Sequence, residues 1–193
     1  MPWEKAYDET EVLERAMQAF WARGYEATSM SDLVEATGIN RGSIYAAYES
    51  KQALFMRALR HYDKIHRADY LAEIARRHPP KQAIIEAFKG AARNTGRGGK
   101  PSGCLLVNSV LELSPHDPEV RDFLDRCLRQ VEDFFCARIE EAQREGTIRK
   151  SMAPRPTAQA LLGLFLGLRV MTRSKPRKAS LEAITAQASS MLA

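Results

Sequence analysis

The stretch T-S-M-S-D-L-V-E-A-T-G-I-N-R-G-S-I-Y-A-A-Y, residues 28–48, predicts two short helices joined by a tight turn. Ser29 and Asp32 have the spacing of a capping box, in which each side chain accepts the other residue's backbone N–H, so a helix should begin there. Gly38 can adopt the positive φ that ends a helix. Asn40 is a favourable N-cap for a second helix. The pattern therefore indicates helix, turn and helix.

The first turn of the second helix is formed by Arg41, Gly42 and Ser43. Glycine costs a helix up to about 1 kcal/mol relative to alanine, so Gly42 indicates that another molecule approaches the backbone closely. A helix N-terminus attracts phosphate through its free N–H groups and its dipole, and Tyr45 adds a donor nearby. These features favour a helix-turn-helix that reads a DNA major groove; an ordinary helical hairpin is the competing interpretation.

Residues 19–55 resemble the DNA-binding signature of the TetR family of bacterial transcriptional regulators. The resemblance implies an all-α protein, with an N-terminal three-helix helix-turn-helix DNA-binding domain followed by a helical ligand-binding and dimerisation domain. Ala46 and Ala47 stand where many members carry larger side chains, so no contacts are expected from them. The resemblance implies DNA contacts from Thr28, Asn40, Arg41, Gly42, Ser43, Tyr45, Tyr48 and Lys51.

The length of 193 residues and the hydrophobic content of 45% suit such a two-domain protein. We expect a DNA-binding domain over residues 1–50 and an effector-binding and dimerisation domain over 51–193, with a helix over 51–77 connecting the two. No apolar run approaches the roughly 20 residues of a membrane span, and the N-terminus lacks a signal-peptide pattern. The expected location is the cytoplasm, without membrane association.

The charge distribution argues against non-specific DNA binding. The chain carries a net charge of +5, but residues 1–50 hold four basic and nine acidic residues, a net charge of −5. Sequence-independent binding needs dense positive charge, so an architectural DNA-binding protein is disfavoured. Attraction to DNA must come from a few well-placed groups, helped by Lys51, Arg57 and Arg60.

Hydrophobic periodicity predicts helices in the rest of the chain as well. Their expected ranges are 8–23, 51–77, 81–94, 104–113, 118–145, 156–171 and 181–192. The helix over 156–171 is apolar on more than one face, and the TetR resemblance implies a four-helix dimer interface formed by the C-terminal helices. A homodimer would suit a palindromic operator. The candidate interface residues are Leu161, Gly163, Leu164, Phe165, Gly167 and Leu168.

The resemblance also implies a pocket for an unidentified small-molecule effector in the second domain. We expect an apolar cavity near Leu105, Phe123, Cys127 and Phe134. Cys104 is a candidate redox sensor, because a helix N-terminus favours the reactive thiolate. The segment G-C-L-L-V-N is also similar to that of a TetR subgroup that includes regulators sensing electrophiles and oxidants through such a cysteine. A buried core cysteine is the competing interpretation.

Metal and cofactor chemistry lacks support in the sequence. Cys127 and Cys136 are nine residues apart on one helix, hence on opposite faces, and the four histidines form no ligand pair and are expected at the surface or in caps. The sequence thus favours a sequence-specific transcriptional regulator, a repressor released from its operator by an effector or by thiol modification, with no enzymatic activity, cofactor or metal. The alternative is a helical small-molecule-binding protein or enzyme with no DNA-binding role.

Overall fold

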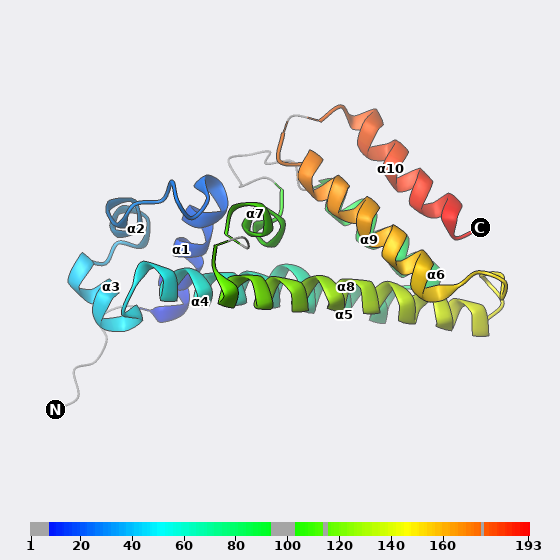
Figure 1. Ribbon diagram of the computed structural model, residues 1–193, viewed down its shortest axis with the longest axis horizontal. Helices are drawn as coiled ribbons and strands as arrows, with labels where there is room; N and C mark the ends of the chain where they lie inside the picture. Colours follow the sequence, from blue (N-terminus) through cyan, green and yellow to red (C-terminus); the bar gives the residue numbers. More distant parts are fainter. Residues whose placement is uncertain (1–7, 94–102, 114–115, 175) are drawn as a thin grey trace.

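The computed structural model describes residues 8–93, 103–113, 116–174 and 176–193, and all regular structure within these ranges is helical (Figure 1). The predicted all-α fold class is therefore confirmed. The helices are α1 (Glu9–Arg23), α2 (Met30–Thr37), α3 (Arg41–Tyr48), α4 (Lys51–Asp63), η1 (Lys64–Asp69), α5 (Tyr70–Arg77), α6 (Pro80–Arg93), α7 (Leu105–Glu112), α8 (Pro118–Arg144), α9 (Pro154–Met171) and α10 (Lys178–Met191).

Side-chain caps begin five of the helices, α1–α4 and α8, and the sequence predicts those of α2 and α3. Ser29 and Asp32 form the full capping box of α2, and Gly38 ends that helix with a φ of 74°. Ser50 accepts the Ala53 N–H at the start of α4. These short-range hydrogen bonds satisfy backbone donors that a helix end leaves free, so the local sequence sets where α2 and α4 begin.

The helices are arranged along one long axis (Figure 1). Helices α1–α3 lie at one end and α6, α9 and α10 toward the other, while α4 and the long α8 run lengthwise between the ends. Helix α7 lies in the middle, between the α1–α2 region and α9. We call α1–α3 the head.

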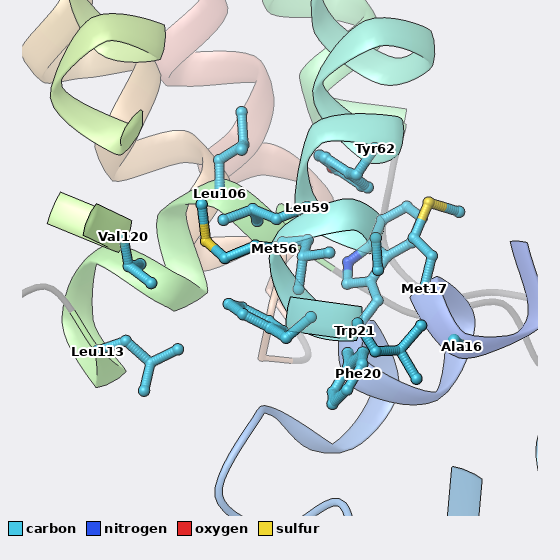
Figure 2. Packing of buried hydrophobic residues seen from close by; sticks show 14 of the residues in the cluster. Ala16, Met17, Phe20, Trp21, Met56, Leu59, Tyr62, Leu106, Leu113 and Val120 are labelled. Atoms are coloured by element: carbon cyan, nitrogen blue, oxygen red, sulfur yellow. The ribbon is translucent and has the colours of Figure 1, made fainter. Parts of the chain in front are cut away.

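The head shares a hydrophobic core with the rest of the chain. One cluster joins residues of α1–α4 to α7 and the first turns of α8. Figure 2 shows Met56 and Leu59 of α4 between α1 residues such as Trp21 on one side and Leu113 and Val120 on the other. Packing is thus continuous across the domain boundary proposed after residue 50, which stays a prediction.

The predicted helix over residues 51–77 is continuous, but its middle is a π-helix. Residues Lys64–Asp69 form η1 between α4 and α5. A π-helix has wider turns than an α-helix. It is rare, and it occurs mostly as short segments, often at functional sites. No sequence signal pointed to it.

A second hydrophobic cluster joins α5 and α6 to α8, α9 and α10. At its centre the rings of Phe88, Phe135 and Phe165 lie with centroids 5.4–5.8 Å apart. Among the described residues, no helix is long and apolar enough to cross a membrane.

Candidate DNA-binding site and effector cavity

Helices α2 and α3 and the turn between them form the candidate DNA-binding site. After Gly38, Asn40 adopts extended backbone and its side-chain oxygen accepts the Ser43 N–H at 2.8 Å. Helix α3 is anchored by Ile44 and Tyr48, which are one turn apart and both buried. Anchoring on this face turns the opposite face of α3 outward.

The outward face of α3 presents Arg41, Gly42 and Tyr45. Tyr45 is 39% exposed, which is uncommon for a large aromatic side chain. The Arg41 guanidinium lies 5.6 Å from the centroid of the Tyr45 ring, and its Nη2 is 3.4 Å from the tyrosine hydroxyl. This pair offers hydrogen-bond donors and a positive charge, the groups that bind phosphate and base edges.

Three further residues predicted to contact DNA, Asn40, Ser43 and Lys51, lie near the Arg41–Tyr45 pair. Asn40 is exposed while capping α3, and Ser43 is half-buried in the first turn. Lys51 is half-buried with its Nζ 4.2 Å from the centroid of the Tyr25 ring, so it starts α4 beside the head. All three lie at the start of α3 or α4, at the same end of the molecule as the Arg41–Tyr45 pair (Figure 1).

Two predicted DNA contacts need correction. Thr28 is fully buried, and its hydroxyl donates to the Gly24 carbonyl. Tyr48 is only 2% exposed, because it follows Ile44 by four residues and so shares its buried face. Neither side chain faces outward, and both instead hold the head together.

Several acidic residues of the head pair with basic side chains of the head or of α4. On α1, Glu9 pairs with Arg57 at 3.1 Å, and Glu11 pairs with Arg15 at 2.5 Å. Asp32 pairs with Arg23. The pKa of Asp32 is lowered to about 2, first by the hydrogen bonds from Ser29 and then by Arg23. These contacts locate much of the head's negative charge at α1 and at the start of α2.

Comparison with known proteins identifies the chain. The family described as "Bacterial regulatory proteins, tetR family" matches residues 12–58, and the family described as "Tetracyclin repressor-like, C-terminal domain" matches residues 79–188. The second match alone covers more than half of the 193 residues. The chain belongs to the TetR family. It is therefore a helix-turn-helix, DNA-binding transcriptional regulator.

Individual TetR-type proteins resemble it over most of their length. The uncharacterized regulator YezE of Bacillus subtilis is 32% identical over 144 residues, which is 75% of this chain and 74% of YezE. The repressor ComR of Escherichia coli is 32% identical over 69% of this chain and 66% of ComR. A cysteine mutant of the TetR family regulator CifR, solved with 26-base-pair operator DNA, superposes with a TM-score of 0.87 at 27% identity, covering 98% of each chain.

Two adjoining cavities lie outside the head of this TetR-family chain. The inner one, of about 30 Å³, lies where η1, α5, α7, α8 and α9 meet, and it is lined mainly by aliphatic side chains. The outer one, of about 290 Å³, extends toward Gly90 and Arg93. The residues that line both are Tyr62, His66, Tyr70 and Arg169.

The predicted effector residues lie largely elsewhere. Leu105 and Phe123 pack in the core that α7 and α8 share with the head. Cys127 belongs to the same core, and burial raises the pKa of its thiol to about 12. Phe134 packs against the second cluster. The inner cavity is bounded by α7 and α8, but through Leu106, Val107, Leu128 and Val131 rather than through the predicted side chains. Periodicity gives a helix's buried face but not the point where several helices leave space.

Cys104 is the predicted residue that does line the inner cavity. It is the N-cap of α7 and is buried against Tyr62, whose pKa is raised well above its usual value by burial and then by Cys104. Tyr62 in turn packs edge-on against Trp21 of the head, with ring centroids 4.8 Å apart. The Tyr62 side chain thus lies between the Cys104 thiol and Trp21 of α1.

His66 was missed by the sequence analysis, which placed the histidines at the surface or in caps. It lies in η1, lines both cavities and is half-buried. Burial lowers the pKa of His66, and the positive charge of Arg169 lowers it further, while Glu14 opposes this. The imidazole is therefore neutral at pH 7. Among the described residues no group of three metal-binding side chains comes together.

Two polar contacts connect the cavity elements to the head. Glu112, at the far end of α7 from Cys104, accepts the Tyr25 N–H at 3.1 Å and the Glu26 N–H at 2.8 Å. Arg173, four residues after Arg169, donates to the carbonyls of Trp21 and Ala22 at the end of α1. Both contacts reach the same α1–α2 segment. We call Glu112 and Arg173 the head clamps.

The predicted dimer residues of α9 divide between two faces. Leu161, Phe165 and Leu168 are buried in the chain's own core, so they do not lie on a free surface. Gly163 and Gly167 are exposed, and a Cβ at either position would meet nothing within 4 Å. Leu164 is half-buried and Val170 is 46% exposed. The outward face of α9 therefore combines small and apolar residues.

Proposed function

We propose that this protein is a homodimeric transcriptional repressor whose two heads bind the half-sites of a palindromic operator. The observation that carries the proposal is the outward face of α3, where Arg41, Gly42 and Tyr45 surround a capped helix N-terminus. Such an end binds phosphate and can place the helix in the major groove. The likeness to CifR in complex with operator DNA and to the repressor ComR supports it.

The proposed dimer uses the outward face of α9 around Gly163 and Gly167. Small residues let two helices approach closely, and an exposed Val170 beside them adds apolar area. Replacing Gly167 by Arg should convert the dimer to monomers in sedimentation-velocity experiments, whereas Ala72→Arg, at an exposed position of α5, should not. Retention of the dimer by the Gly167 variant would place the interface elsewhere.

The proposed trigger for release is a change in the cavity, by ligand binding or by modification of Cys104. Helix α7 runs from Cys104 to Glu112, and α9 carries Arg169 one turn before Arg173. A shift of either helix therefore reaches the α1–α2 segment through the head clamps. A ligand that binds one arrangement better than the other changes the population of DNA-competent heads.

Operator binding tests this function. We expect the protein to bind DNA from upstream of its own gene, or DNA selected from a genomic library, at least about a hundredfold more tightly than unrelated DNA at the same salt concentration. Tyr45→Ala should weaken this preference, whereas Arg144→Ala, at the exposed C-terminal end of α8, should not. Equal weak binding to every DNA in the library would refute the proposal.

A further inference from the structure

Arg169 is a buried cation at the boundary between the two cavities. It is 9% exposed, and its Nε has no hydrogen-bond partner among the described residues. Its guanidinium lies 5.2 Å from the centroid of the Phe165 ring. Removing a guanidinium from water costs free energy unless an anion or hydrogen-bond acceptors replace the lost hydration, so this position calls for an acceptor.

The carboxylates in the described part of the chain do not supply that acceptor. No aspartate or glutamate lines either cavity. The carboxylates around the cavities bind other side chains: Asp63 pairs with Arg67, Glu86 with Lys89 at 2.8 Å, and Glu14 with His61 at 3.1 Å. Three arginines line the cavities. Arg67 is paired with Asp63, and Arg93 lies 3.7 Å from a Glu86 carboxylate oxygen. Arg169 has no carboxylate within ion-pair distance among the described residues, so it supplies the positive charge of the lining.

Polar groups surround Arg169 on one side and apolar groups on the other. The Tyr70 hydroxyl donates to the Glu86 carbonyl over 3.4 Å, a long hydrogen bond that leaves it able to turn to another acceptor. His66, neutral at pH 7, carries one further N–H. The inner cavity beyond them is lined by Leu106, Val107, Leu128, Val131, Leu162, Phe165 and Leu166 among others.

We propose that this site binds a small organic carboxylate, with its carboxylate group on Arg169 and its apolar body in the inner cavity. The role of this ligand as effector rests on the proposed function, but its binding does not depend on DNA. About 30 Å³ holds only two or so water-sized volumes of roughly 10–15 Å³ each. An aromatic body must therefore displace side chains of the wall, including Leu106 and Val107 of α7, the helix that ends at the head clamp Glu112.

Calorimetric titration of the full-length protein without DNA tests the proposal. The probes are matched acid and amide pairs: benzoate with benzamide, phenylacetate with phenylacetamide, and 1-naphthoate with 1-naphthamide. We expect at least one acid to bind about tenfold or more tightly than its amide, since charge-assisted hydrogen bonds are stronger than neutral ones. The result that overturns the proposal is an absence of preference for the acid in all three pairs.

Variants separate the Arg169 site from other anion binding. Arg169→Gln should abolish the preference for the acid, and Arg169→Lys should retain part of it. The control Arg129→Gln removes an exposed arginine of α8 and should leave binding unchanged. A preference for the acid that survives Arg169→Gln, in a variant with a wild-type circular dichroism spectrum, would overturn the assignment.

The stability of the ligand-free protein gives a second readout. If Arg169 serves to bind a ligand, its buried positive charge destabilises the ligand-free protein. Arg169→Met should therefore leave the melting temperature unchanged or raise it. A large fall in melting temperature would mark Arg169 as a structural residue and overturn the proposal. Fluorescence anisotropy of labelled operator then asks whether the bound acid releases DNA: binding without release leaves this site standing and refutes the proposed trigger.

Discussion

Replacing Glu112 by Ala should loosen the head from α7. The substitution removes both hydrogen bonds to the Tyr25 and Glu26 N–H groups, at 3.1 and 2.8 Å. Hydrogen bonds to a charged group contribute about 1.5–3 kcal/mol when buried, but these are partly exposed, and water can replace the lost acceptor. About 1 kcal/mol for each bond gives a loss of roughly 2 kcal/mol in the free energy of unfolding.

Thermal unfolding measures this loss. For a chain of 193 residues, 1 kcal/mol corresponds to about 2–4 °C, so the melting temperature should fall by roughly 4–8 °C at a fixed protein concentration. Glu112→Gln keeps an uncharged acceptor and should show about half of that fall. A melting temperature within about 1 °C of wild type for Glu112→Ala would show that the clamp contributes no stability.

The same variant tests whether the clamp transmits the effector signal. If the clamp transmits the signal, the effector should still bind to Glu112→Ala but should weaken its operator binding less than in the wild type. The ratio of the operator affinity without effector to that with effector should then approach one. Gly24 provides a matched probe, because a Cβ there would lie 2.8 Å from the Glu112 Oε2. Gly24→Ala should therefore be more destabilising in the wild type than in Glu112→Ala. Equal effects in both backgrounds would contradict the contact.

Three other predictions concern the head and the cysteines. Gly42→Ala should stabilise the free protein by up to about 1 kcal/mol, reduced by crowding because the new Cβ would lie 3.3 Å from the Asn40 Oδ1. The same substitution should weaken operator binding by about tenfold in anisotropy titrations. Unchanged operator affinity would argue against close approach of DNA to this backbone. Asp32 has a folded-state pKa of about 2, below its ordinary value, so the stability it gives to α2 is present above about pH 4 and is lost as the pH falls toward 2. Carboxyl NMR titration should show this midpoint and its rise toward the ordinary value in Ser29→Ala, and a midpoint near 4 in the wild type would contradict it. Cys127, with a pKa of about 12, has a thiolate fraction on the order of 1 in 10,000 at pH 8. Mass spectrometry after iodoacetamide treatment should therefore find Cys104, which lines the inner cavity, labelled before Cys127; labelling of Cys127 ahead of Cys104 in the folded protein would contradict this order.

The sequence predicts the head well because its structure depends on short-range hydrogen bonds. The capping box of Ser29 and Asp32, the positive φ of Gly38 and the cap at Asn40 each involve residues within a few positions of one another. Tyr48 was misassigned although the signal was present: its spacing of four from the apolar Ile44 puts both on one buried face.

The cavity could not be located in the same way, since it depends on how distant helices cross. Cys104 was found because the chemistry of a thiol at a helix N-terminus is local. Arg169 had a usable signal that was overlooked, as a single charged residue in the apolar run from Leu161 to Met171. Its burial follows from Phe165 one turn earlier, which fixes the inward face of α9.

The π-helix η1 lets the chain carry an extra residue between the head and α5 without re-aiming the head. It follows α4, which begins at Lys51, and each hydrogen-bonded ring of a π-helix encloses one more residue than that of an α-helix. A π-helical residue therefore turns the chain by less than the roughly 100° of an α-helical residue, so the wider turns take up one residue with little change in the phase of α4 relative to α5. Two of the six residues of η1, His66 and Arg67, line the inner cavity, so the wide segment adds side chains to the cavity wall.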